Sequence, residues 1–296
     1  TLLWEPFNED LDGVYSVERI IQKNIIGNRI VFVETNLDLQ LRFSYEWSTS
    51  KSYGFVRTCS IENLGESSSE IELLDGLENI LPFGVDRGLQ DVRSTLVDAY
   101  KKNELIEDVG LGLFTLSSMI VDKAEPSEAL KASVVWAHGL TDTKYLLSSS
   151  QLKNFRFGHE IQTEHEVKAE RGAYFINARV TIEKQEEKQW MIVCDVDQSA
   201  LDVDSLSSFL STPQSIASTI NLEIEKGSFS LKVKVGQADG IQLTGDELTV
   251  GRHFSNVMFN IMRGGSFEDQ YNIQRRDWIE YVQGQNHQVA MRSENF

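Results

Sequence analysis

The chain has 296 residues, with 28 lysines and arginines against 45 aspartates and glutamates, so its net charge at pH 7 is −17. This charge excludes a protein that binds nucleic-acid phosphates regardless of sequence, and it disfavours docking on anionic lipids, because both need clustered lysine and arginine. No apolar run reaches the ~20 residues of a membrane-spanning helix. We therefore expect a globular protein with no nucleic-acid partner and no membrane partner.

The first two thirds of the sequence alternate as β-strands do. From residue 37 to residue 47 every second residue is apolar, which predicts one half-buried strand with its apolar side chains on a single face. Apolar residues three or four positions apart predict one amphipathic helix near residues 89–104. The same strand reasoning applies to residues 30–33, 54–62, 69–74, 112–118 and 131–138.

The clearest strand pair covers residues 173–182 and 189–197. The segment between them, residues 183–188, is wholly polar, so the two strands are predicted to form an antiparallel hairpin with a solvated loop. Both strands also carry apolar residues on their second face. That pattern favours a layered sandwich over a sheet open to water on one side.

Helical spacing begins after residue 197. Helices are predicted at residues 204–210, 245–263 and 275–283. Isoleucines also recur every four residues at Ile216, Ile220 and Ile224. Residues 229–235 fit either a strand or a helix, and a capping box of Thr244 and Glu247 predicts the start of the helix that follows them. The predicted domains are therefore residues 1–197, with the strands, and residues 198–296, with the helices.

Two His-Glu pairs resemble part of a zinc-binding motif. His159-Glu160 and His165-Glu166 each lack the second histidine four residues later that such a helix needs. The stretch alternates like a strand, so we expect His165 to be half-buried there.

A row of aspartates resembles a calcium loop. Ala200 stands where such a loop needs glycine, and Leu206 stands where it needs glutamate. Turn chemistry at a strand end and the dipole at a helix start explain the row better. Its members are Asp195, Asp197, Asp202 and Asp204. We expect no metal site and no cofactor.

The two cysteines and one loop are the remaining candidates for reactive or binding residues. Cys59 and Cys194 both fall in apolar strand patterns and are predicted to be core thiols, not nucleophiles. Binding residues concentrate on loops, and the connection after the helix at residues 245–263 is the most site-like loop in the chain. Its candidate substrate-binding side chains are Arg263, Glu268, Asp269 and Tyr271. A solvated turn is the alternative, and no residue is assigned a catalytic role.

Five segments carry a family resemblance that spans the chain from about residue 4 to residue 283. They are LENILPFGVD, STLVDAYKKNEL, AEPSEALKASVVWAHGL, ERGAYFINARV and RHFSNVMFNIMRGGSFEDQYNI. Together they resemble the N-terminal region of large bacterial proteins of the cellobiose-phosphorylase-like group. The resemblance implies a mainly β protein, with an antiparallel β-supersandwich like that of galactose mutarotase followed by linker helices.

In that group a six-hairpin (α/α) barrel follows the helices and carries the catalytic acid. The resemblance therefore implies a non-catalytic domain of a glycoside phosphorylase or hydrolase, inactive alone, with an oligosaccharide as the substrate of the parent enzyme. Its implied partners are the barrel and a second copy of the chain. The chain begins at Thr1 without a methionine, and we expect it to be a piece of a longer polypeptide. Two unpaired thiols favour the cytoplasm.

Two other functions remain open at the level of sequence. An aldose 1-epimerase with the same sandwich would need a histidine and a carboxylate converging on the sugar. The histidines on offer are His138, His159, His165, His253 and His287, none in a familiar epimerase motif. A carbohydrate-binding module without a catalytic partner is the third alternative.

Overall fold

The computed structural model describes residues 2–118, 120, 129–242, 244–265, 269 and 272–292. The chain divides into two compact units. The first comprises Thr1–Lys23 and Arg29–Ile224, and the second comprises Asn24–Asn28 and Glu225–Phe296. The predicted boundary at residue 197 stays a prediction. Among the described helices, none combines the length and the apolar character needed to cross a membrane.

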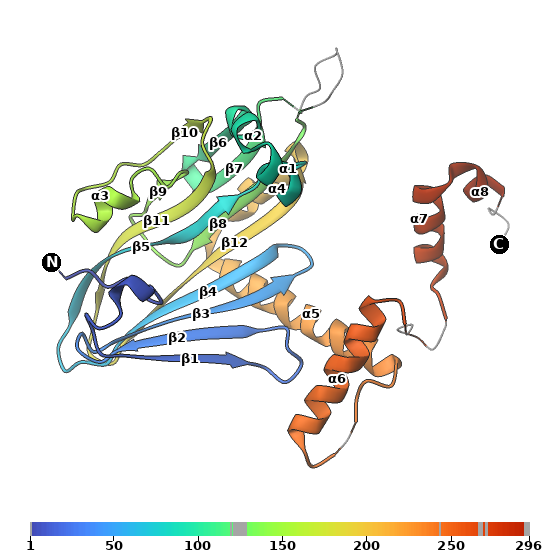
Figure 1. Cartoon of the computed structure of the whole chain (residues 1–296), viewed down its shortest axis with the longest axis horizontal. Helices are drawn as coiled ribbons and strands as arrows, with labels where there is room; N and C mark the ends of the chain where they lie inside the picture. The colour runs from blue at the N-terminus through green and yellow to red at the C-terminus, as the bar shows by residue number, and fades with distance from the viewer. Residues whose placement is uncertain are drawn as a thin grey trace. The chain divides into compact units, whose positions relative to one another are not determined.

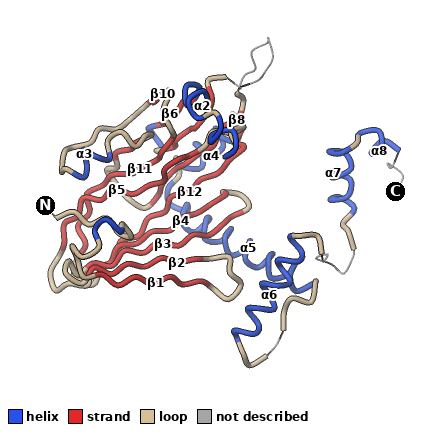
Figure 2. The backbone as a smooth tube through the Cα atoms, viewed as in Figure 1, coloured by secondary structure: helices blue, strands red, loops and turns tan. Residues whose placement is uncertain are grey.

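Strands make up most of the first unit, as Figure 2 shows in red. The larger sheet has nine strands in the order β1-β2-β3-β4-β12-β8-β7-β6-β10 (Figure 1), each antiparallel to its neighbours. Its strands are β1 (Val17–Lys23), β2 (Ile30–Asn36), β3 (Leu41–Ser50), β4 (Gly54–Asn63), β6 (Lys101–Ile106), β7 (Leu111–Leu116), β8 (Lys131–His138), β10 (Glu166–Lys168) and β12 (Glu187–Ser199).

The smaller sheet has three antiparallel strands in the order β5-β11-β9. They are β5 (Ser69–Ile80), β11 (Gly172–Ile182) and β9 (Lys144–Leu146). Two antiparallel sheets facing each other confirm the predicted mainly β, sandwich-like class.

The main core lies between the two sheets. Phe43, Cys59 and Trp190 face it from the larger sheet, and Tyr174 and Ile176 face it from β11. All five side chains are buried because alternate residues of each strand point to the same face. The alternation seen in the sequence therefore predicted these core positions correctly.

The predicted hairpin of β11 and β12 is wrong, because the two strands belong to different sheets. β11 pairs with β5 and β9, whereas β12 pairs with β4 and β8. Between them Gln185 adopts a left-handed backbone conformation with φ of 57°, and its N–H donates to the carbonyl of Asn63 at 3.0 Å. The chain thus crosses from one sheet to the other, which buries both faces of β12.

Two further sequence predictions fail at element ends. Residues 37–40 form a turn, because the Asn36 side chain accepts hydrogen bonds from the backbone N–H groups of Asp38 and Leu39, so β3 begins only at Leu41. The single helix predicted near residues 89–104 is two short helices. They are α1 (Arg87–Val92) and α2 (Ser94–Tyr100), separated at Arg93, and β6 follows directly.

Helices cover the outer faces of the sheets in the first unit. On the larger sheet, α4 (Ala200–Leu210) contributes Leu210, and the first part of α5 (Ile216–Gln237) contributes Ile216, Ile220 and Ile224. These side chains lie in one cluster with Trp136. These isoleucines are buried, as their four-residue spacing predicts. On the smaller sheet, α3 (Leu152–Arg156) covers part of the outer face. Helices thus shield the larger sheet and part of the smaller one.

The second unit is helical. It contains the second part of α5, which includes residues 229–235, together with α6 (Glu247–Met262), α7 (Arg275–Gln285) and α8 (His287–Arg292). Phe254 packs with Ile26 and Val235 at its centre. The predicted capping box is wrong, because Asp246 caps α6 through its carboxylate, which accepts from the N–H groups of Leu248 and Thr249.

Replacing Gly76 by alanine is expected to destabilise the smaller sheet. Gly76 lies opposite Phe175 in the ladder, and an added Cβ would stand 2.1 Å from the carbonyl oxygen of Tyr174. A backbone carbonyl cannot move aside as the end of a flexible side chain can. We therefore expect the free energy of unfolding, measured with urea, to fall by about 1–3 kcal/mol or more. Gly284→Ala is the control, since nothing lies within 4 Å of its Cβ position. Equal stabilities for the two variants would contradict the expectation.

Candidate functional site

A cavity of about 270 Å³ lies on the outer side of the larger sheet, beside α4. Its lining comes from the turn after β3, from β8, from the end of β12 and from α4. The nine lining residues are Ser52, Tyr53, Trp136, Asp195, Gln198, Asp202, Ser205, Leu206 and Phe209. An aromatic wall and several polar groups thus converge on one space, which is the usual composition of a ligand site.

A β-bulge places the polar wall. β12 pairs Asp195 with Val134 and then Gln198 with Ala132, so residues 196–197 stand against the single residue Ser133 and β12 carries one extra residue. Asp197 takes a left-handed conformation with φ of 62°. The side-chain amide of Gln198 donates to Asp195 Oδ2 at 3.1 Å, which couples these two lining residues. Bulges re-aim side chains in this way, often beside functional sites.

Three aromatic rings form the apolar wall. The rings of Tyr53 and Phe209 stack with centroids 5.4 Å apart, and Trp136 meets Phe209 edge to face at 6.5 Å. Trp136 is 1% exposed and forms the floor. Tyr53 and Phe209 pack against the cluster that attaches α4 to the sheet, and Trp136 belongs to it.

The two carboxyl groups of the cavity have opposite environments. Burial raises the pKa of Asp195, and the charges of Asp197 and Asp202 add to the rise, while the N–H of Val196 opposes it. The pKa of Asp202 is lowered, because the hydroxyl and the backbone N–H of Ser199 both donate to its carboxylate. None of the nine lining residues is lysine, arginine or histidine.

This arrangement suits binding better than catalysis. Glycoside hydrolysis needs two carboxyl groups free to act on opposite sides of the bond. Asp202 is committed to the capping box of α4, since it binds Ser199 through two hydrogen bonds. The nine described lining residues include no histidine, which an epimerase site would pair with a carboxylate.

The predicted binding loop lies elsewhere, in the second unit. Arg263 is exposed and places its guanidinium 5.3 Å from the ring centroid of Phe259. Asp269 accepts the N–H of Asn272 through its backbone carbonyl at 2.7 Å. Among the described residues no hydrogen bond or ion pair joins Arg263 to Asp269. Glu268 and Tyr271 lie outside the described residues, so this site stays a prediction.

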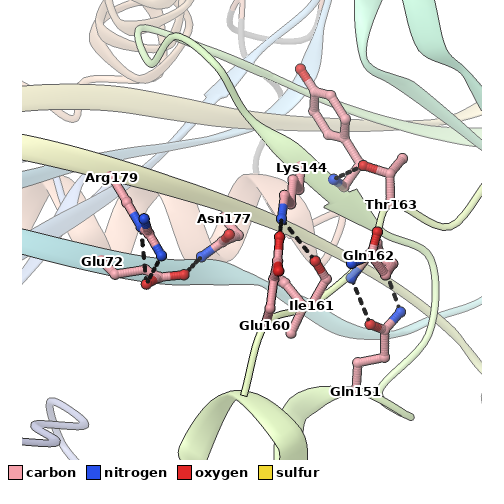
Figure 3. Close-up of polar contacts among 10 residues, drawn as sticks. Glu72, Lys144, Gln151, Glu160, Ile161, Gln162, Thr163, Asn177 and Arg179 are labelled. Carbon is pink, nitrogen blue, oxygen red and sulfur yellow. Dashed lines mark hydrogen bonds and ion pairs between the residues drawn. The ribbon is translucent and has the colours of Figure 1, made fainter. Parts of the chain in front are cut away.

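The His-Glu pairs do not form a zinc site. Glu160 pairs with Lys144 at 2.8 Å (Figure 3), and His165 lies 3.4 Å from Glu107. The side chain of His165 is 62% exposed, so its predicted half-buried position is wrong, because β10 begins only at Glu166. Among the described residues, no group of three or more histidine, cysteine, aspartate or glutamate side chains is placed to hold a metal ion.

The polar contacts of Figure 3 hold residues 160–163 along β9. Lys144 also donates to the carbonyl of Ile161, and Gln151 exchanges two hydrogen bonds with the backbone of Gln162. On the neighbouring strands Arg179 donates to Glu72 at 3.2 Å. The hydrogen-bonding groups of these side chains are paired with one another, so we interpret the contacts as structural.

The cysteines behave as core thiols, as predicted. Cys59 is fully buried, which raises its pKa, and burial raises the pKa of Cys194 to about 11. Neither thiol is a thiolate near neutral pH, so neither is a nucleophile in the resting protein.

Asp195→Asn is expected to change the pH dependence of stability. Because the pKa of Asp195 is raised in the fold, the unfolded chain releases this proton at lower pH. As the pH rises from the ordinary aspartate pKa to the raised one, the folded state holds more protons and the free energy of unfolding falls. Urea unfolding across acidic pH should show Asp195→Asn gaining stability relative to the wild type as the pH rises.

Asp202→Asn provides a control of opposite sign. The lowered pKa of Asp202 stabilises the fold above the ordinary aspartate pKa, and this contribution is lost as the pH falls. The variant should therefore lose stability relative to the wild type as the pH rises. The same trend for both variants would contradict the assigned environments.

Comparisons with known proteins give structural neighbours, and three of them are described below. No protein-family model and no curated protein matches the chain. A structure assigned as a kojibiose phosphorylase from the human microbiome aligns at TM-score 0.36 and 13% identity, over 82% of this chain and 25% of its own. A bacterial glucoamylase complexed with acarbose aligns at TM-score 0.43 and 11% identity, over 80% and 31%.

A family GH92 alpha-mannosidase from Bacteroides thetaiotaomicron aligns at TM-score 0.29 and 10% identity, over 78% of this chain and 26% of its own. The chain thus spans between a quarter and a third of the length of these structures. They are glycoside phosphorylases or hydrolases by description. All three TM-scores are below 0.5, so the fold assignment rests on the strand pairing of this chain.

Proposed function

We propose that this chain is the non-catalytic N-terminal domain of a carbohydrate-active enzyme, a glycoside phosphorylase or hydrolase. Two lines of support combine. The sequence resembles that region of cellobiose-phosphorylase-like proteins from about residue 4 to residue 283, and a two-sheet sandwich is followed by helices in the implied order. The free thiols of Cys59 and Cys194 agree with a cytoplasmic parent enzyme.

One observation carries the proposal: large apolar side chains stand exposed on the helices of the second unit. On α6, Phe259 is 50% exposed and Met262 is 68% exposed. On α7, Trp278 is 47% exposed and Tyr281 is 65% exposed. A contiguous exposed apolar patch marks an interaction site, and we propose that these side chains belong to one. We assign it to a further domain of the parent enzyme, the (α/α) barrel that the resemblance implies.

The first experiment separates a supporting domain from an enzyme. The chain of residues 1–296 is incubated with cellobiose, with and without inorganic phosphate, and glucose and glucose 1-phosphate are measured. We expect neither product. The non-catalytic role would be overturned if the wild-type chain released glucose or glucose 1-phosphate and Asp195→Asn abolished that release.

The second experiment tests the exposed helices in the longer natural gene product. Phe259→Ser is expected to lower activity and to raise hydrogen exchange in the barrel, because its surface partner is lost. Val92→Ser is the control, since Val92 is 81% exposed on α1 of the first unit. Equal activity for wild type and Phe259→Ser would contradict the docking role. The resemblance also implies a homodimer, and measuring the molecular mass of this longer protein in solution tests it.

A further inference from the structure

The cavity beside α4 has two chemically different sides. Tyr53, Phe209 and Leu206 offer an apolar side, whereas Asp195 and Gln198 offer acceptors and an amide on the polar side. Among the described residues no hydrogen bond engages the hydroxyl of Tyr53, so it is available to a ligand. The volume of about 270 Å³ is below the ~300–1,000 Å³ usual for drug-sized ligands, so the cavity admits one ring and not a chain.

We infer that this cavity binds a single hexose ring, the terminal unit of an oligosaccharide. The inference rests on the proposed function for its substrate class and on the cavity for its geometry. A pyranose has an apolar C–H face that packs on aromatic rings and a rim of hydroxyl groups that donate to carboxylates. The aromatic wall of Tyr53 and Phe209 would pack on the C–H face of the sugar, and the Asp195 carboxylate would accept hydrogen bonds from its hydroxyl groups.

The surroundings favour a neutral polyol over an organic cation. The Oδ2 atom of Asp202 accepts both hydrogen bonds from Ser199, and Lys131 lies near enough to lower the pKa of Asp202 further while it pairs with Asp197. Each oxygen of Asp195 accepts one hydrogen bond, Oδ1 from the N–H of Val196 at 2.8 Å and Oδ2 from the Gln198 amide at 3.1 Å, and each keeps a second acceptor position for a ligand. Two neighbouring hydroxyl groups of a sugar can each donate a charge-assisted hydrogen bond to one carboxylate. A bound hexose here would hold the sandwich on the substrate chain while the catalytic domain acts on it.

The test measures binding of glucose and cellobiose to the chain by saturation-transfer NMR and calorimetry. Asp195→Asn and Tyr53→Ala are each expected to weaken binding by about tenfold or more, through lost hydrogen bonds and lost stacking. Asp204→Asn is the control, because Asp204 is exposed on the same helix and does not line the cavity. Thermal unfolding of each variant verifies that it folds.

The outcomes of this test support or overturn the hexose site independently of the proposed function. Saccharide binding that Asp195→Asn and Tyr53→Ala weaken, with Asp204→Asn unchanged, supports the hexose site, even if the chain proves catalytic by itself. Equal binding by all variants places the sugar elsewhere and overturns it. Binding of spermidine in place of sugars, with the same dependence on Asp195, also overturns it and makes the cavity a cation site.

Discussion

Arg57→Ala is expected to lower the free energy of unfolding by about 3–5 kcal/mol, because it leaves a carboxylate buried without its cation. Arg57 donates to Asp75 at 2.6 Å between the two sheets, with side-chain exposures of only 10% and 14%. The indole N–H of Trp190 donates to the other oxygen of Asp75 at 2.7 Å. The guanidinium also lies 4.5 Å from the ring centroid of Tyr45. This pair links β4 to β5, and so one sheet to the other.

Urea unfolding followed by tryptophan fluorescence measures the loss. Arg42→Ala is the matched control, because its pair with Glu62 is 45% and 32% exposed and contributes less than about 1 kcal/mol. The double variant Arg57→Met with Asp75→Leu should recover most of the stability, since an apolar pair of similar size removes the buried charge altogether. A loss for Arg57→Ala no larger than that for Arg42→Ala would show that water reaches Asp75.

Much of the sandwich could be predicted from the sequence, but not the partition of its strands. Alternation identifies which face of a strand is buried, and it located β4 and β8 to within a residue or two. It does not say which strand lies beside which. The polar segment before β12 fitted a hairpin loop. The chain passes into the other sheet at the left-handed Gln185, whose N–H donates to the carbonyl of Asn63, and alternation does not show this contact.

The cavity could not be assembled from the sequence, because its walls come from distant segments. Tyr53 and Phe209 have no common motif, and they meet only because α4 packs against the turn after β3. Turn chemistry and the helix dipole explained Asp195 and Asp202 at the level of sequence, and in the structure Asp202 lies in the first turn of α4 as a member of its capping box. No local signal marked the bulge, because Val196 continues the apolar alternation of Ile192 and Cys194 through it.

Phe254→Ala is expected to unfold the second unit while the first stays folded. Phe254 is 2% exposed at the centre of a small cluster with Ile26 and Val235. Truncating a buried phenylalanine costs about 3–5 kcal/mol, and a unit with so few buried residues has little stability to lose. Hydrogen exchange should show α6 and residues 24–28 losing protection, with β11 and β12 unchanged.

Phe259→Ala is the control on the same helix, with a side chain that is 50% exposed and outside that cluster. It should leave exchange near the wild-type rate, because no buried contact is removed. If Phe254→Ala instead raised exchange across β11 and β12, the two units would unfold as one. The sandwich would then depend on helices whose exposed faces are proposed to hold another domain, and separating that domain would weaken the fold as well as the activity.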